Sequence, residues 1–259
     1  MGIIKSILPD EWYGKFFRLK NSLLNRNEEE QETPAVLQTR KLFYSQFLKN
    51  GELCFDVGAN VGNRIEPMLQ IGAKVIAVEP QKKCIEILQK KFGDRITIVT
   101  KGLSGKEEVK EFYISDATTI SSFSKEWIDK VKETRFKYYA WNKVEKVEMT
   151  TLDNLIHQYG LPAFIKIDVE GYESEVLSGL TKKVKFISFE YTVPEQTDKA
   201  LDCLQKLIKI NPDLKCNFSV GESMQLEKQE WLTAQEMLSF VSSKSFTDTG
   251  FGDIYIYNI

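Results

Sequence analysis

Short apolar runs alternate with amphipathic stretches along most of the chain. The apolar runs lie near residues 52–57, 74–79, 96–99, 164–168, 186–190, 214–220 and 253–257. Between them, apolar residues recur at helical spacing near 35–48, 63–71, 81–92, 196–210 and from about 172 onward. Strands that are apolar throughout and are separated by helices are typical of a mostly parallel sheet covered on both faces. The pattern therefore predicts an α/β fold.

The first 34 residues differ from this alternation. Residues 1–26 place apolar side chains at helical spacing and carry five basic residues against two acidic ones, and residues 28–34 are largely acidic. We predict an N-terminal helical extension with an acidic linker over 1–34 and one large domain over 35–259. The extension either packs on the domain or a partner chain, or lies peripherally on an anionic membrane.

A second departure, over about residues 101–150, predicts an insertion. Residues 109–114 alternate like a partly exposed strand, and 116–122 form a loop rich in hydroxyl groups. A helix around Trp127 and a mixed aromatic and basic cluster over 135–143 follow. The insertion either shapes a pocket for a small-molecule or glycan acceptor, or packs its aromatic rings on the core.

Composition narrows the classes of function. The 35 basic and 37 acidic residues give a formal net charge of -2, so we expect no nucleic-acid partner. The four cysteines show no paired spacing, and the single histidine excludes a histidine-built metal centre. No run reaches the ~18 apolar residues of a membrane span. We expect a cytoplasmic protein, and nothing in the pattern indicates its oligomeric state.

The segment 54–62 indicates a strand that runs into a glycine-bearing turn, with Asp56 at the strand end. A dinucleotide fingerprint, G-x-G-x-x-G, lets the backbone approach a pyrophosphate. Here Asn60 stands in place of the middle glycine, and Asp56 would repel a phosphate. The turn therefore favours a cationic nucleoside cofactor without phosphate, such as S-adenosylmethionine, over a dinucleotide.

Acidic residues end four of the apolar runs. Glu79 follows 75–78, where a carboxylate can accept both hydroxyl groups of a ribose. Asp56, Asp168 and Glu190 end three other runs. Because the carboxyl ends of parallel strands meet at one edge, we predict that these four acids line one crevice. For Glu190, a helix cap or an ion pair is an equally simple explanation.

The segment 166–173 places three acids around a turn. Asp168 ends a strand, and Gly171 permits a tight turn into the next helix. Glu170 and Glu173 then lie near the helix N-terminus, where the helix dipole stabilises carboxylates. For Asp168 we predict a position where a transferred methyl group and its acceptor meet.

These segments together resemble the FkbM-type methyltransferases over about residues 40–258. The matching segments are 55–62, 78–80 and 165–173, and the shorter 151–153 and 252–254 also fit. The resemblance implies a class I (Rossmann-like) methyltransferase fold, with a seven-stranded mostly parallel sheet whose last strand is antiparallel. It also implies O-methylation of sugars, glycolipids or natural products. Many relatives have a histidine after the residue that matches Glu190, whereas this chain has Tyr191 and Thr192.

The resemblance assigns roles to individual residues. The methionine end of the cofactor would lie on the loop of Asp56, Gly58, Ala59, Asn60 and Gly62. The ribose would bind Glu79, the adenine would border Pro80, Leu103 and Ser104, and the sulfonium would lie beside Asp168.

We predict direct in-line methyl transfer with Asp168, Glu170 and Glu190 as the candidate catalytic carboxylates. Alternatively, Asp168 and Glu190 hold Mg²⁺, which would lower the acceptor pKa. Two alternatives belong to other functional classes. One is an NAD or nucleotide-sugar enzyme, and the other is a non-catalytic binding module of the same fold.

Overall fold

The computed structural model describes residues 33–258. The predicted extension over 1–26 and its proposed membrane contact therefore lie outside the described residues. The first described helix is α3 (Pro34–Tyr44), whose N-cap, Thr33, accepts a hydrogen bond from the Val36 N–H at 3.4 Å. Pro34 suits the first turn because its missing N–H has no helical acceptor there. The helix begins where the predicted acidic linker ends.

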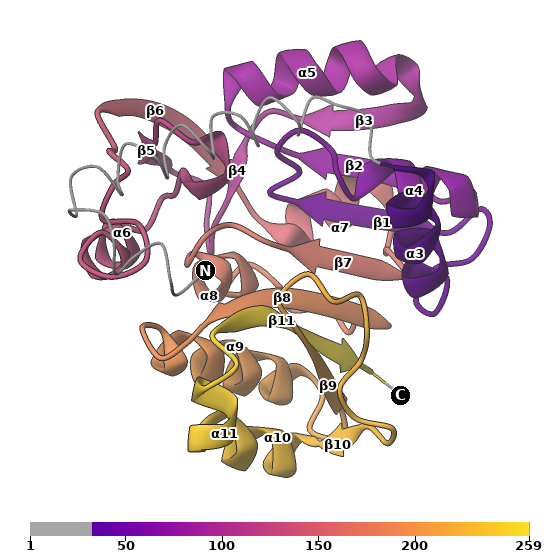
Figure 1. The fold of residues 1–259 in the computed structure, drawn as a ribbon. Helices are drawn as coiled ribbons and strands as arrows, with labels where there is room; N and C mark the ends of the chain where they lie inside the picture. The colour runs from indigo at the N-terminus through magenta and orange to yellow at the C-terminus, as the bar shows by residue number, and fades with distance from the viewer. Residues whose placement is uncertain (1–32, 259) are drawn as a thin grey trace.

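A large sheet forms the centre of the molecule (Figure 1). Its strands are β1 (Leu53–Val57), β2 (Lys74–Val78), β3 (Ile96–Val99), β7 (Phe164–Ile167), β8 (Phe186–Thr192), β9 (Lys215–Val220), β10 (Leu232–Thr233) and β11 (Phe251–Tyr257). The order is β10-β9-β11-β8-β7-β1-β2-β3, and β11 is antiparallel to both β8 and β9. The predicted mostly parallel sheet with an antiparallel last strand is confirmed, and the short β10 adds an eighth strand at one edge.

The order in which successive strands are added to the sheet reverses at β1. The chain adds β2 and β3 on one side and later places β7 on the other side, so β1 pairs in parallel with both β2 and β7. In the β1–β7 register, Asp56 lies opposite Lys166. A reversal of this kind leaves a crevice at the carboxyl ends of the strands, where open α/β sheets bind ligands.

Helices cover both faces of the sheet. On one face lie α3, α4 (Ile65–Ile71) and α5 (Lys82–Phe92), and on the other lie α7 (Leu152–Tyr159), α8 (Glu173–Leu177), α9 (Thr197–Ile210) and α10 (Ala234–Val241). In β1, Cys54 packs with the first group and Phe55 with the second, which explains why the strand is apolar throughout. In the described part of the chain, no helix is both long and apolar enough to cross a membrane.

Three short elements complete the main domain: η1 (Gly93–Arg95) after α5, α11 (Lys244–Thr247) after α10, and β4 (Gly102–Leu103), which leads into the insertion.

The insertion forms a small second sheet at one side of the molecule (Figure 1). Its strands are ordered β4-β6-β5, with β5 at Val109–Ile114 and β6 at Lys143–Thr150. Between β5 and β6 lie η2 (Thr118–Ile120) and α6 (Lys125–Val131). The aromatic side chains Phe136, Tyr139 and Trp141 pack around the fully buried Trp127. The aromatic rings of the insertion thus form a core of their own.

Candidate active site

A cavity of about 980 Å³ opens at the carboxyl ends of β1, β2, β7 and β8. Asp56, Glu79, Asp168 and Glu190, the four predicted strand-end acids, all line it. The insertion contributes part of the opposite wall, including residues 118–121 and Phe136. The cavity volume is near the upper end of the range for small-molecule sites, about 300–1,000 Å³. It can therefore hold a nucleoside cofactor together with part of an acceptor.

The glycine loop is held tightly between β2 and the end of β7. The backbone N–H groups of Gly58 and Ala59 both donate to the Val78 carbonyl, at 3.0 and 3.1 Å. Gly58 has φ +80°, and a Cβ there would lie 1.8 Å from the carbonyl oxygen of Asp168. Asn60 also has a positive φ, of 47°. A side chain at Gly58 would therefore push the two strand ends apart.

Asp56 is a buried carboxylate without a donor. Its exposed fraction is 1%, and neither of its oxygens has a hydrogen-bond partner among the described residues. Burial and the charge of Asp168 raise its pKa, whereas Lys166 acts in the opposite direction. A buried acceptor without a donor is costly. A cationic ligand group in the cavity would satisfy Asp56, as the ammonium of a methionine moiety would.

Glu79 is held by two backbone groups. Its Oε2 accepts a hydrogen bond from the Asn60 N–H at 2.8 Å, and its Oε1 accepts one from the Gln81 N–H at 2.7 Å. Burial raises the pKa of Glu79 to about 7. Each carboxylate oxygen keeps a second lone pair, and Glu79 lines the cavity. The carboxylate is therefore oriented to accept hydrogen bonds from a diol.

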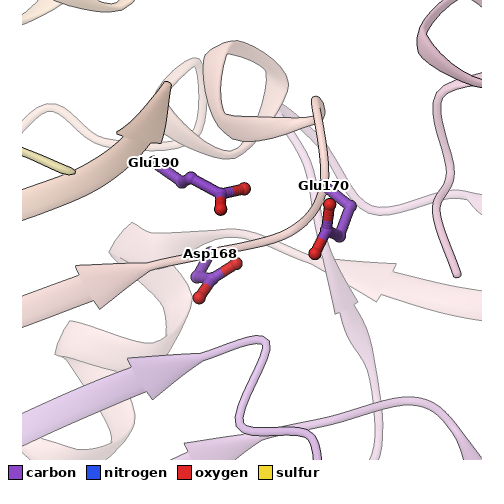
Figure 2. Close-up of side chains that lie close together, drawn as sticks. All are labelled: Asp168, Glu170 and Glu190. Carbon is purple, nitrogen blue, oxygen red and sulfur yellow. The ribbon is translucent and has the colours of Figure 1, made fainter. Parts of the chain in front are cut away.

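Asp168, Glu170 and Glu190 converge in the cavity. Each offers an oxygen within 4.8 Å of the others, and Figure 2 shows the three carboxylates pointing toward a common space. Lys166 Nζ donates to Asp168 Oδ2 at 2.8 Å and neutralises part of the charge. Burial, followed by the charge of Asp168, raises the pKa of both Glu170 and Glu190 well above the ordinary range.

The turn that carries Glu170 is fixed by two neighbours. Glu170 has φ +54°, and a Cβ on Gly171 would lie 2.4 Å from Trp127 of the insertion. Glu173 Oε1 accepts hydrogen bonds from the Val169 and Gly171 N–H groups, at 3.0 and 3.1 Å. Glu173 therefore holds the turn that presents Glu170 to the cavity, at the start of α8.

A family model described as the methyltransferase FkbM domain matches residues 56–246. The chain belongs to the FkbM methyltransferase family. Its sheet order and antiparallel β11 are those of the class I fold of S-adenosylmethionine-dependent methyltransferases. The match includes the glycine loop and all three converging carboxylates.

Several solved methyltransferase structures are similar to this FkbM-family chain at low sequence identity. A TehB-like SAM-dependent methyltransferase from Corynebacterium glutamicum has a TM-score of 0.47 and 8% identity, over 96% of this chain and 100% of that one. A putative O-methyltransferase from Klebsiella pneumoniae has a TM-score of 0.44 and 9% identity, over 98% and 93%. An O-methyltransferase from Bacillus cereus in complex with SAH has a TM-score of 0.40 and 10% identity, over 97% and 93%. No curated protein matches the chain.

The structure brings most of the predicted site residues of this FkbM-family chain to the cavity wall. The predicted residues that line it are Asp56, Gly58, Ala59, Asn60, Glu79, Pro80, Leu103, Asp168, Glu170 and Glu190. Gly62 and Ser104 do not line it. Gly62 lies against α5, where a Cβ would be 2.4 Å from Phe92, and the Ser104 hydroxyl donates to the Lys106 carbonyl at 2.6 Å. Both residues shape the loops behind the wall.

Five basic residues on the cavity wall were not among the residues predicted from the sequence: Arg40, Arg64, Lys101, Arg135 and Lys166. Lys166 alternates with Asp168 along the β7 segment, and that spacing places two side chains on the same face of a strand. Arg64, two residues after Gly62, was also within reach of sequence reasoning. Arg40 and Arg135 reach the cavity only through the tertiary arrangement of α3 and the insertion.

Proposed function

We propose that this protein transfers the methyl group of S-adenosylmethionine to a hydroxyl oxygen of a sugar, glycan, glycolipid or small natural product. The observation that carries the proposal is the convergence of Asp168, Glu170 and Glu190 in the cavity that the glycine loop also lines. A cofactor loop beside carboxylates suits removal of a proton from a hydroxyl group, and burial raises the pKa of two of them, Glu170 and Glu190.

The residues present fit the cofactor. Asp56 would hold the ammonium, Glu79 the ribose diol, and Pro80 and Leu103 would border the adenine. Asp168 would lie beside the sulfonium. The cofactor supplies a methyl group on a positively charged sulfur, and the sulfur leaves as a neutral thioether. The protein therefore needs mainly to align the acceptor, exclude water and accept one proton.

Glu170 or Glu190 is the proposed base. As the acceptor oxygen bonds to the methyl carbon, its proton passes to one of these carboxylates. Their raised pKa values make them stronger bases than exposed carboxylates. The Asp168 carboxylate, which accepts a hydrogen bond from Lys166 Nζ, would face the sulfonium.

The acceptor side of the cavity favours a molecule with several hydroxyl groups. Thr118, Thr119 and Ser121 of the insertion line the cavity. Phe123 and Phe136 add aromatic surface to the same wall. Hydroxyl groups, carboxylates and aromatic rings together suit a sugar, whose ring has polar edges and apolar faces.

The same three carboxylates also form a donor set that a hard divalent cation such as Mg²⁺ accepts. In that arrangement Asp168, Glu170 and Glu190 would hold the ion, which would lower the pKa of the acceptor hydroxyl. Methyl transfer that is unchanged after EDTA treatment and dialysis would exclude this arrangement and leave the carboxylates as bases.

Calorimetry with S-adenosylhomocysteine tests the cofactor assignment. We expect Asp56→Ala and Glu79→Ala each to weaken binding by about 10- to 100-fold, since each removes a charged hydrogen-bonding partner. Glu66→Gln is the control, because Glu66 pairs with Arg95 on the surface of α4. Undetectable binding to the native protein, or equal binding by all variants, would sink the assignment.

A radiolabelled methyl-transfer screen over free sugars, glycans, glycolipids and polyphenols tests the acceptor class. Transfer to a hydroxyl group that falls at least tenfold in Glu170→Gln or Glu190→Gln would support the proposal. Cofactor binding with no transfer to any acceptor would favour a non-catalytic binding module. NAD binding in place of S-adenosylhomocysteine would favour the dinucleotide alternative.

A further inference from the structure

The end of the cavity near α3 is basic. Arg40 of α3 and Arg64, the N-cap of α4, both line it, as does Glu222 from the loop after β9. Arg64 Nη2 forms an ion pair with Glu222 Oε2, and Arg40 Nη2 lies 4.0 Å from the same oxygen. Arg40 Nη1 also donates to the Asn63 carbonyl at 3.1 Å. Three separate parts of the chain thus meet around the Arg64 guanidinium.

One corner of the Arg64 guanidinium lacks an acceptor. Its Nη1 is buried and has no hydrogen-bond partner anywhere in residues 33–258. The other terminal nitrogen is held by Glu222, whose side chain is 61% exposed. A buried charged donor without an acceptor is costly. The ion pair with Glu222 fixes the plane of the guanidinium and leaves Nη1 for another anion.

The same cavity also contains a buried acceptor without a donor, the carboxylate of Asp56. Both oxygens of Asp56 are buried and without a donor among the described residues. Asp56 lies in β1 just before the glycine loop and Arg64 lies two residues after Gly62, and both line the cavity wall. An acceptor and a donor that are both unsatisfied on one loop match a ligand group that carries both charges. An α-amino acid end, with an ammonium and a carboxylate, is such a group.

We propose that Arg64 binds the carboxylate of the methionine moiety of the cofactor, while Asp56 binds its ammonium. Glu222 and Arg40 act as positioning residues, Glu222 by holding Nη2 and Arg40 by packing beside the guanidinium. This inference rests on the proposed function, because it names how that cofactor is recognised.

The crowding of the two guanidinium groups supports the assignment. Burial, and next the positive charge of Arg64, lower the pKa of Arg40 to about 10, and Glu222 only partly offsets this. The two largely buried guanidinium groups share one exposed carboxylate, that of Glu222. A carboxylate between them would relieve the repulsion.

Paired ligands that differ by one carboxylate test the proposal. Calorimetry would compare S-adenosylhomocysteine with its decarboxylated analogue on the full chain. We expect the native protein to prefer the intact ligand by about 10- to 100-fold, as for a hydrogen-bonded charge. In Arg64→Gln this preference should largely disappear, because only the affinity for the intact ligand falls. Arg64→Lys should keep part of the preference for the intact ligand, because the positive charge remains. The rest should be lost, because an ammonium lacks the planar fork of a guanidinium.

Binding of 5′-methylthioadenosine, which lacks the whole amino acid end, reports whether each variant is folded. Its affinity should be the same in the native protein, Arg64→Gln and Arg64→Lys. The exposed Glu222 offers a milder change, and Glu222→Gln should reduce the preference for the intact ligand without affecting 5′-methylthioadenosine.

Several outcomes would overturn the inference. Equal affinity of the native protein for S-adenosylhomocysteine and for its decarboxylated analogue would overturn the inference, and this result needs no variant. If Arg64→Gln keeps the native preference for the intact ligand, or loses affinity equally for both ligands, the inference is also overturned. The proposed function would remain intact in either case. A native protein that binds none of the three ligands would instead overturn the proposed function, and the inference with it.

Discussion

Gly58 shows how a single residue determines the shape of the cofactor loop. It follows β1 directly, and the end of β7 passes so close that the Asp168 carbonyl occupies the space of a side chain. Its positive φ adds a conformational preference for glycine. This contact sets the distance between the loop that would bind the cofactor and the carboxylate that would face the sulfonium.

We expect Gly58→Ala to lower both stability and cofactor affinity, because the new Cβ must displace the β7 end. Gly51→Ala is the matched control, since Gly51 has φ +82° but nothing within 4 Å of a Cβ. The control should cost about 1 kcal/mol for the backbone conformation, and Gly58→Ala about 1–3 kcal/mol more for the clash. Chemical denaturation measures both, and equal costs would contradict the argument.

At the scale of elements, the insertion is fastened to the main domain through Arg135. This side chain lies between α6 and β6, and its Nε and Nη2 donate to the two carboxylate oxygens of Glu195 at 2.9 and 3.0 Å. Nη2 also donates to the carbonyl oxygens of Val193 and Gly250. These acceptors follow β8 and precede β11, so one guanidinium joins the insertion to two loops of the main sheet. The part of the cavity wall that the insertion forms depends on this connection.

Arg135→Lys should loosen the insertion, because an ammonium cannot form the fork and reach both carbonyl groups. We expect a loss of about 1–3 kcal/mol in stability and faster amide hydrogen exchange over residues 132–142. Lys132→Met is the control, since Lys132 forms an exposed pair with Asp129 in the same segment. The control should leave hydrogen exchange unchanged. Equal exchange in native and Arg135→Lys proteins would show that the aromatic core alone holds the insertion.

At the scale of the whole molecule, the active-site edge concentrates buried acids. Burial raises the pKa of Glu79 and of Glu173 to about 7, and that of Asp253 to about 6. A carboxyl group with a raised pKa in the folded state holds its proton more tightly than in the unfolded chain. Folding therefore becomes less favourable as pH rises from the unfolded pKa through the folded one.

We expect the protein without ligand to be most stable near pH 5 and to lose stability up to about pH 8. The fall in melting temperature should be on the order of 5 °C. Glu79→Gln should reduce the fall, since it removes one of the titrating groups, whereas the surface change Glu66→Gln should not. Differential scanning calorimetry across this range measures both. A melting temperature that rises from pH 5 to 8 would contradict the burial of these acids.

The sequence pattern predicted elements best where one periodicity dominates. The boundaries of β2, β3, β5, α5 and α9 lie within one residue of those predicted. In contrast, β6 and α10 were not predicted as elements. β6 mixes charged residues with apolar ones, and four of its eight residues are charged, so it lacks the signal of a buried strand. Its stability comes from pairing with β5 and β4, which are distant in sequence.

The sequence by itself determined the class of fold, the glycine loop and the acids at the strand ends. Those features depend on local causes: periodicity, backbone conformation at glycine, and the position of a residue at the end of a run. The tertiary structure decided which side chains meet, because Arg64 and Glu222, 158 residues apart, are joined only by the order of strands in the sheet. The same folding gathers Asp168, Glu170 and Glu190 in one cavity. It also leaves the Asp56 oxygens and Arg64 Nη1 without a hydrogen-bond partner among the described residues. Contacts between such distant residues cannot be predicted from local sequence, because they depend on how distant segments pack.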